Sequence, residues 1–459
     1  MKRIPRPGAF GGLLSLAMVA ASFATWPASA ADRLPASAVG VPQATGEVVV
    51  YDMRRGENLF TLARQYLNRP ADYASVQKIN RITNPHRIPV GTRLRIPLSL
   101  LRSEPLQARL VAVRGDVRLS ANGREIAPAV GAEIQQGTAL ETGRDGFITL
   151  SLPNGSRTSL PTLTRMRIER LRRIVLTGSI DYDFVVDAGK VETKASPLGK
   201  DPNNRFRIRT PRAIAAVRGT QFRVGLEGEA SLAEVLEGTV AAGPGAGSIT
   251  GTPTSLTPGL GAVITPDGGV ATETLLAAPD LMRPGKVQVD PLVRLALAPQ
   301  GQARGYHLQI AEDAGFTKVL AEASGEAAEF SFANIPNGSL FVRVSAIARS
   351  GLEGMAQTFA MRRVLAGLNA SATADANTMR FAWGGEGEGR RIYHFQMGSI
   401  EEGRPLLIDE AGLLQEGIAL RDLGPGVYRW RVGVRQVTDD GIVENWLPFE
   451  KITVAAPER

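Results

Sequence analysis

The sequence contains no cysteine and only three histidines in 459 residues. The lack of cysteine excludes disulfides, zinc–thiolate sites, iron–sulfur clusters and a cysteine nucleophile. His86, His307 and His394 lie far apart, and none has a partner at metal-ligand spacing. The chain also lacks a zinc-protease helix motif and a nucleophile elbow. We therefore expect no catalytic residue, no metal and no cofactor, and a protein that is not an enzyme.

Long hydrophobic runs are missing after the first thirty residues. Those thirty hold a basic head, a short apolar run over 13–21 and small residues at 28–30. This pattern predicts a cleavable signal peptide, cut after Ala30, and a periplasmic protein. The alternative, an uncleaved anchor helix, would need a longer apolar run. No later segment approaches eighteen apolar residues, so we expect no transmembrane segment after cleavage.

Acidic residues are fewer than basic ones, 45 against 53, which gives a net charge of +8. The signal peptide carries three basic residues and no acidic one, so its removal leaves +5. No run of Lys and Arg is dense enough for a nucleic-acid-binding arm, so we expect no nucleic-acid partner. In an exported protein, the basic excess favours a polyanionic wall or surface.

The length suggests three or four domains. Composition and turn residues divide the chain further. The predicted segments are a signal peptide (1–30), a flexible leader (31–46), a small mixed module (47–98), a β-rich domain (108–271) and two antiparallel sandwiches (285–365 and 366–455). The expected fold class is therefore multidomain and mainly β.

Residues 47–97 predict the order strand, helix, helix, strand. The β-branched run 47–51 reads as a strand, and Asn58 can cap the helix that follows. Leu59, Leu62, Ala63 and Tyr66 repeat at helical spacing, and a second such stripe ends at Asn80. Residues 94–97 read as the closing strand.

This segment resembles the LysM family. The resemblance rests on the motif 56–60 (GENLF), on Ile79-Asn80, on Asn84-Pro85 and on the string 89–97 (PVGTRLRIP). It departs from the family where Glu57 replaces an Asp and Phe60 a Trp. The resemblance implies a βααβ fold and binding of glycans that contain N-acetylglucosamine, such as peptidoglycan, in a shallow groove between two loops. The implied glycan-binding residues are Gly56, Glu57, Asn58 and Leu59 in the first loop, and Asn80, Arg81, Ile82, Thr83 and Asn84 in the second.

Some of these residues have a structural alternative. Leu59 and Asn58 are equally explained as a core residue and a helix cap. Arg81 and Arg87 could meet carboxylates of the wall peptides, and a solvated face explains them as well.

Residues 108–271 predict short strands joined by glycine turns. Three strings, 113–117 (VRGDV), 152–156 (LPNGS) and 210–222 (TPRAIAAVRGTQF), resemble the FecR-type domain, a β-rich module of envelope signalling. Arg218 reads as an ion-pair partner on a turn. Asp181 and Asp183 share one face of a strand, and without a histidine or metal partner they read as solvent-facing.

The last two segments repeat a loose strand pattern and resemble fibronectin type III domains. Trp383, Tyr428 and Trp430 read as core or corner aromatics. His307 and His394 read as ordinary strand residues.

These features favour a noncatalytic envelope protein that binds peptidoglycan through residues 47–98 and presents its β domains to a protein partner. The alternatives are a periplasmic signalling component acting through the FecR-type domain, and a subunit or activator of a wall hydrolase.

Overall fold

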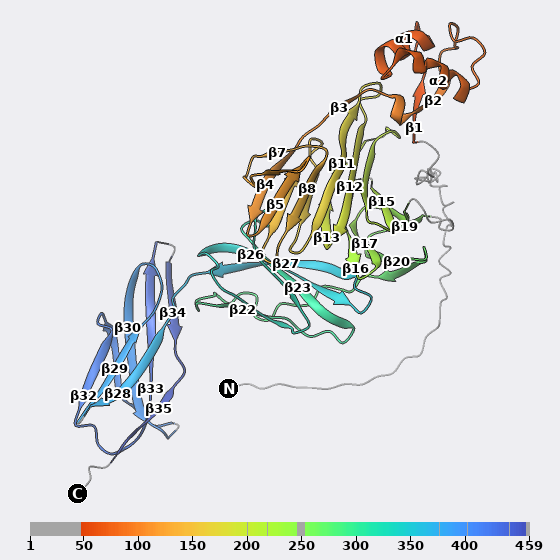
Figure 1. Ribbon diagram of the computed structural model, residues 1–459. Helices are drawn as coiled ribbons and strands as arrows, with labels where there is room; N and C mark the ends of the chain where they lie inside the picture. Colours follow the sequence, from red (N-terminus) through yellow and green to blue (C-terminus); the bar gives the residue numbers. More distant parts are fainter. Residues whose placement is uncertain are drawn as a thin grey trace, which may run out of the picture. The chain divides into compact units, whose positions relative to one another are not determined.

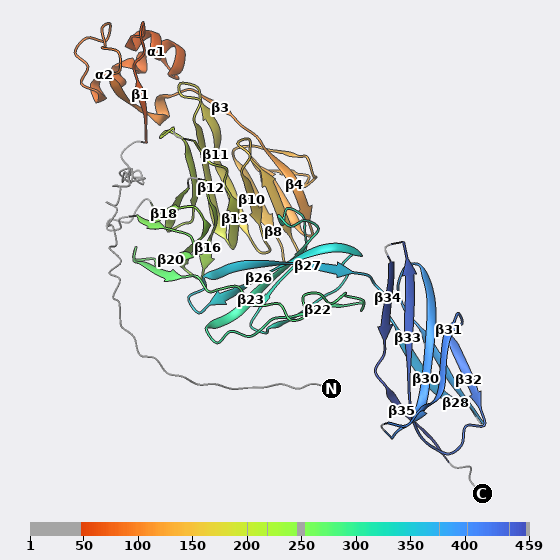
Figure 2. The same ribbon diagram turned by 180° about the vertical axis from the view of Figure 1, so that it is seen from behind.

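The computed structural model describes residues 47–455 except 200, 218, 246–252, 376, 402 and 440. The expected signal peptide, its cleavage point, the leader and Arg218 lie outside the described residues. The described part confirms the multidomain, mainly β fold class, with helices confined to 59–100. Figures 1 and 2 show the same chain from opposite sides.

The N-terminal module has the predicted order of elements. Strands β1 (Val48–Asp52) and β2 (Arg93–Pro97) pair antiparallel, with Tyr51 opposite Leu94. Between them lie α1 (Leu59–Tyr66), the 3-10 turn η1 (Pro70–Asp72) and α2 (Tyr73–Ile79); η2 (Leu98–Leu100) follows β2. The apolar face of α1, the strand residues Val49 and Ile96, and Val76 of α2 share one buried core.

The central domain consists of two large sheets. The first has the order β21-β20-β17-β16-β13-β10-β9-β4-β7, and the second the order β19-β18-β15-β14-β12-β11-β8-β5-β6, with β3 paired to β11. All pairs are antiparallel except β12 and β14. The first sheet comprises β4 (Ala108–Arg114), β7 (Glu133–Ile134), β9 (Phe147–Ser151), β10 (Arg157–Leu160), β13 (Lys190–Lys194), β16 (Gln221–Glu227), β17 (Ala230–Glu237), β20 (Leu260–Ile264) and β21 (Val270–Thr274). The second comprises β3 (Ser103–Pro105), β5 (Val117–Ala121), β6 (Arg124–Ile126), β8 (Thr138–Thr142), β11 (Arg165–Ile174), β12 (Ile180–Ala188), β14 (Arg205–Arg209), β15 (Ala213–Val217), β18 (Val240–Pro244) and β19 (Thr254–Leu256).

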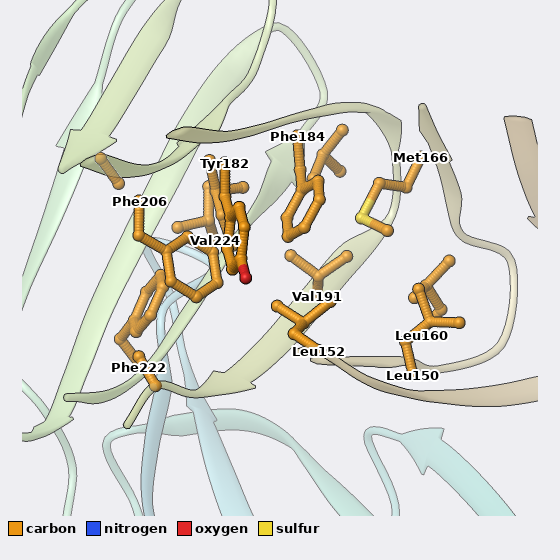
Figure 3. Close-up of a cluster of buried hydrophobic side chains, with 14 of the residues drawn as sticks. Leu150, Leu152, Leu160, Met166, Tyr182, Phe184, Val191, Phe206, Phe222 and Val224 are labelled. Carbon is orange, nitrogen blue, oxygen red and sulfur yellow. The ribbon is translucent and has the colours of Figure 1, made fainter. Parts of the chain in front are cut away.

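The two sheets share one hydrophobic core. Figure 3 shows its aromatic part, where Tyr182, Phe184 and Phe206 of the second sheet face Phe222 and Val224 of the first. The ring centroids of Phe184 and Phe206 lie 5.6 Å apart in an edge-to-face arrangement. Because the inward residues alternate along each strand, the remaining side chains project from the two outer faces.

The first C-terminal sandwich pairs β22 (Val293–Ala296) with β25 (Glu329–Phe332) and packs them against a four-stranded sheet. That sheet has the order β24-β23-β26-β27, with β23 (Ala303–Ala311), β24 (Val319–Gly325), β26 (Gly338–Ala348) and β27 (Glu353–Arg363).

The second sandwich also consists of two antiparallel sheets, with more strands than the first. Its sheets are β28-β29-β32 and β31-β30-β33-β34, with β35 paired to β33. Trp383 and Trp430 are buried in its core, and the Tyr428 hydroxyl donates to the Gly424 carbonyl at 2.8 Å, as a corner tyrosine does. The strands are β28 (Asn369–Asp375), β29 (Thr378–Gly384), β30 (Arg390–Ser399), β31 (Leu406–Leu413), β32 (Gly417–Arg421), β33 (Gly426–Thr438), β34 (Gly441–Trp446) and β35 (Glu450–Val454).

Candidate functional site

The first predicted loop joins β1 to α1. Gly56 has a φ of +86°, and a side chain added there would meet nothing within 4 Å, so its backbone is open to solvent. The Glu57 carboxylate accepts hydrogen bonds from the Tyr51 hydroxyl at 2.7 Å and from the Arg54 amide at 2.9 Å. These bonds fix the loop and leave its glycine edge exposed.

Asn58 begins α1 as its cap. Its side-chain oxygen accepts hydrogen bonds from the amides of Phe60 and Thr61, both at 3.0 Å. The Thr61 hydroxyl in turn accepts from the Asn58 amide at 3.1 Å, which completes a reciprocal capping box. The side-chain oxygen of Asn58 is therefore already engaged by the helix.

Leu59 lies in the core of the module, with a relative exposure of 0%. Its side chain therefore cannot reach a sugar, and of the two roles open to it from sequence the structure shows the core role. The Leu59 amide donates to the Pro85 carbonyl at 3.1 Å. This bond holds the first loop against the second.

The second loop joins α2 to β2. The Asn80 side chain donates to the carbonyls of Val76 and Arg95, both at 2.8 Å, and accepts from the Arg95 amide at 2.7 Å. It thereby ties the end of α2 to β2. Ile82 packs partly against the module core.

The exposed part of the second loop consists of Arg81, Thr83 and Asn84. Arg81 has a φ of +53°, which turns the chain out of the helix. The Asn84 side-chain oxygen accepts from the His86 amide at 3.0 Å, which leaves its NH2 group available. Within the described part of the chain, the side chains of Arg81 and Thr83 have no hydrogen-bond or ion-pair partner, so they are free to meet a ligand.

An aromatic group beside the loops was not predicted as part of the site. The Phe60 ring lies 4.4 Å from the Tyr73 ring and 4.6 Å from the His86 ring, measured between centroids. His86 follows Pro85, the residue that joins the two loops. No sequence signal predicts this group, because Phe60 and Tyr73 belong to separate helices and His86 to the second loop. The three rings meet only in the folded structure.

The charge of the module is positive. Residues 47–97 contain nine Lys and Arg and four Asp and Glu, a difference of +5. Two of the acidic residues are paired: Asp72, which is mostly buried, with Arg69, and the exposed Asp52 with Arg93. Burial raises the pKa of Tyr51 to about 12, and the hydrogen bonds to the Glu57 carboxylate add to this rise. Glu57 therefore accepts from a tyrosine that stays protonated at physiological pH.

The other carboxylates considered from sequence are not solvent-facing. Asp181 and Asp183 of β12 have relative exposures of 0% and 1%, which corrects the expectation. Arginines of the neighbouring strands cover them: Arg172 bonds Asp181 at 2.8 Å, and Arg209 bonds Asp183 at 2.7 Å. Both carboxylates belong to a structural ion-pair network rather than to a catalytic pair.

This network reaches the N-terminal module through Glu47. Its carboxylate bonds Arg170 of β11 at 3.0 Å and also bonds Arg207 of β14. Burial alone would raise the pKa of Glu47, but the two guanidinium groups outweigh burial and lower it to about 2. The Asn203 side chain adds two 2.9 Å bonds to the amide and carbonyl of Val50.

No helix among the described residues is long and apolar enough to cross a membrane. In the same part of the chain, His, Asp and Glu residues form no group of three or more that could hold a metal ion.

Two segments match known protein families. Residues 51–97 match the model of the LysM domain, and residues 138–241 match that of the FecR protein. A search of curated proteins finds no match.

Among solved structures, a crystal structure described as an anti-sigma factor from Parabacteroides distasonis aligns with 30% of this chain at 18% identity and a TM-score of 0.24. The chain spans only 59% of that protein's length. A two-domain fibronectin type III segment of chicken tenascin aligns with 39% of this chain and all of its own, at 15% identity and a TM-score of 0.18. Domains FN1–FN3 of chicken CNTN1 align with 55% of this chain and 98% of their own, at 12% identity and a TM-score of 0.19.

TM-scores this low add nothing to the assignment of the fold, which stands on the sheets themselves. The two family matches agree with the elements they cover: β1, the two helices and β2 in one case, and β8 to β18 in the other. The chain thus carries a LysM domain at residues 51–97 and a FecR domain at residues 138–241, two noncatalytic families typical of extracytoplasmic proteins.

Proposed function

We propose that this protein is a noncatalytic periplasmic component of the cell envelope that binds peptidoglycan through its LysM domain. The ligand is a glycan containing N-acetylglucosamine, held between loop 56–59 and loop 80–84. The FecR domain and the two sandwiches are presented to a protein partner of the envelope. Export through a signal peptide cleaved after Ala30 belongs to this proposal, as do the domain boundaries expected from the sequence.

The contact between the two loops supports the proposal most directly. The bond from the Leu59 amide to the Pro85 carbonyl joins the first loop, which contains the open Gly56 backbone, to the second loop. An acetamido sugar offers one amide and several hydroxyls, which exposed backbone groups, Thr83 and Asn84 can pair with directly or through water. Phe60 and His86 lie beside these groups and can pack a sugar ring or its methyl group.

The contacts of the loop residues favour some of them over others as glycan contacts in this proposal. The side chains of Leu59, Asn58 and Asn80 shape the loops, because the core, the helix cap and β2 engage them. Gly56, Arg81, Thr83 and Asn84 are the residues that a glycan can reach. Glu57 fixes the first loop through Tyr51 and the Arg54 amide, and Ile82 packs partly against the module core.

Co-sedimentation of residues 31–459 with insoluble peptidoglycan tests this proposal. The variant Thr83→Arg places a long side chain on the exposed part of the second loop, and we expect pelleting to fall at least about tenfold, since this side chain would occupy the space proposed for the sugar. The matched control is Ser99→Arg, which adds the same charge at an exposed position of η2.

The two variants separate specific binding from charge. Equal loss in both variants, or none in either, would remove the glycan proposal. Release of soluble muropeptides by the wild-type protein would instead support an enzymatic reading.

The FecR domain supports a second candidate function, a periplasmic signalling component. In this reading, the FecR domain receives a cue from a partner. Proximity labelling in the envelope distinguishes the two, because a scaffold captures wall proteins and a signalling component captures a receptor or regulator.

A further inference from the structure

A slot of about 430 Å³ lies between the FecR domain and the first sandwich. Strands β10, β13, β16 and β17 of the FecR domain form one wall. The loop 314–316 and strands β26 and β27 of the sandwich form the other. Sites between domains are common places for ligands.

The FecR wall presents one row of side chains across four adjacent strands. Arg157 of β10 pairs in register with Lys194, Lys194 with Gln221, and Gln221 with Glu237 of β17. The row therefore runs from two cations through an amide to a carboxylate. With strands about 4.8 Å apart, its two ends are separated by about 14 Å.

The end charges of this row are not neutralised. Among the described residues, neither the Lys194 ammonium nor the Glu237 carboxylate has an ion-pair or hydrogen-bond partner, and both residues are exposed. The Arg157 guanidinium donates to the Thr317 hydroxyl of the sandwich. The nearby Asp313 carboxylate is occupied by the amides of Gly315, Thr317 and Lys318.

The next row of the same sheet is used differently. Glu192 bonds Arg343 of the sandwich at 2.8 Å, and Arg223 lies 3.4 Å from Glu353. These buried pairs hold the two walls together. In the Arg157–Glu237 row, by contrast, the sandwich contacts Arg157 through Thr317 and leaves Lys194 and Glu237 exposed.

Apolar side chains complete the lining. Leu236 and Met355 lie at the Glu237 end, and Phe316 lies in the opposite wall. Phe316 has a φ of +51°, which is sterically costly for a bulky residue, and the Arg343 guanidinium covers its ring at 4.5 Å. Backbone strain of this kind concentrates at ligand sites.

We propose that this slot binds a short extended peptide with a free carboxylate at one end and a free amine at the other. About four extended residues span 14 Å, so the carboxylate meets Arg157 and Lys194 while the amine meets Glu237. Stem peptides cut free of the peptidoglycan glycan have this length and these terminal charges, whereas in the intact wall the glycan acylates the N-terminal amine. The assignment rests on the proposed function, because a protein held on the wall meets the peptides that are released from it.

Calorimetric titration of residues 31–459 with the tetrapeptide L-Ala-γ-D-Glu-L-Lys-D-Ala tests this inference. The wild-type protein binds, and we expect Lys194→Ala and Glu237→Ala each to weaken binding about tenfold. The control is Lys318→Ala, which removes the same charge from a lysine that pairs with exposed Glu312, and it keeps wild-type affinity. The N-acetylated, C-amidated peptide, which lacks both terminal charges, binds at least about tenfold more weakly.

Failure of the wild type to bind the tetrapeptide, or equal affinity for the blocked peptide, overturns the inference. The same holds if Lys194→Ala and Glu237→Ala bind like the wild type. Thr83→Arg distinguishes this site from the glycan site, because it loses peptidoglycan pelleting and keeps tetrapeptide binding. A wild type that pellets with peptidoglycan but does not bind the tetrapeptide would overturn the peptide inference and leave the proposed glycan site unaffected.

Discussion

Buried charges at single residues are stabilised by partners from distant parts of the chain. Asp183 is 1% exposed and pairs with Arg170, Arg207 and Arg209. Removing its charge leaves these arginines uncompensated in a place that water barely reaches.

Asp183→Asn should therefore lower the free energy of unfolding by about 3 kcal/mol. The control is Asp187→Asn on the same strand, whose pair with Arg167 is largely exposed, and it should cost less than about 1 kcal/mol. Chemical denaturation followed by fluorescence measures both. Equal losses of unfolding free energy in the two variants would mean that burial does not determine how strongly these ion pairs stabilise the protein.

His307 makes the free energy of unfolding depend on pH above about 6.5. Burial alone would lower its pKa, but Glu353 and Glu322, each 2.9 Å from a ring nitrogen, outweigh burial and raise the pKa to about 9. A raised folded pKa stabilises the protein fully below pH 6.5, and the contribution is lost as pH rises through about 9.

The wild type should lose about 3 kcal/mol of unfolding free energy between pH 6.5 and pH 9.5 through this group. His307→Gln should remove that slope, because its amide does not titrate. Denaturation curves at several pH values measure it, and parallel profiles for the two proteins would contradict the assignment.

At the scale of elements, helix α1 depends on its cap. Asn58→Ala removes the acceptor for two amides, so we expect the LysM domain to lose about 1 kcal/mol. Asn58→Ser restores a capping oxygen and should recover most of this loss. Hydrogen exchange of the α1 amides, measured as the temperature rises, compares the stability of the LysM domain in the wild type and the two variants. An alanine variant as stable as wild type would show that the cap is dispensable.

The elements of the LysM domain were predictable from sequence because their signals are local. The spacing of Leu59, Leu62 and Ala63 defines the face of α1, and the module core buries all three. The sequence could not decide between sugar and core for Leu59, since both roles suit an apolar residue after a turn. Burial by β1 and β2 decides it.

The alternation along β12 placed Asp181 and Asp183 on one face, yet their environment was not predictable. Parallel pairing of β12 with β14 brings Arg205 opposite Asp181 and Arg207 opposite Asp183. Glu47 joins them from the other domain. Such neighbours come from pairing across long sequence separations, and no local pattern carries that information.

At the scale of the whole molecule, buried charges connect the FecR domain to the first sandwich. Glu353 of β27 lies 3.3 Å from the Lys190 ammonium and 3.4 Å from the Arg223 guanidinium, and it is 8% exposed. Burial would raise the pKa of Glu353, but Arg223, His307 and Lys190 hold it well below its usual value.

We expect Glu353→Gln to destabilise the FecR domain and the first sandwich together, by about 3 kcal/mol. Glu227→Gln is the control, because its pair with Arg304 also joins the two domains but is exposed, and it should cost less than about 1 kcal/mol. Differential scanning calorimetry measures the unfolding transitions of the two domains in each variant. A Glu353→Gln variant that shifts only one domain's transition would contradict the coupling.

The central claim is that a glycan binds between the two LysM loops. Amide chemical-shift mapping of residues 31–459 during addition of N-acetylchitotetraose tests it residue by residue. We predict the largest shifts in 56–59 and 80–86, and their loss in Thr83→Arg. Unchanged amide chemical shifts in both loops, at sugar concentrations high enough to displace the protein from insoluble peptidoglycan, would contradict the account.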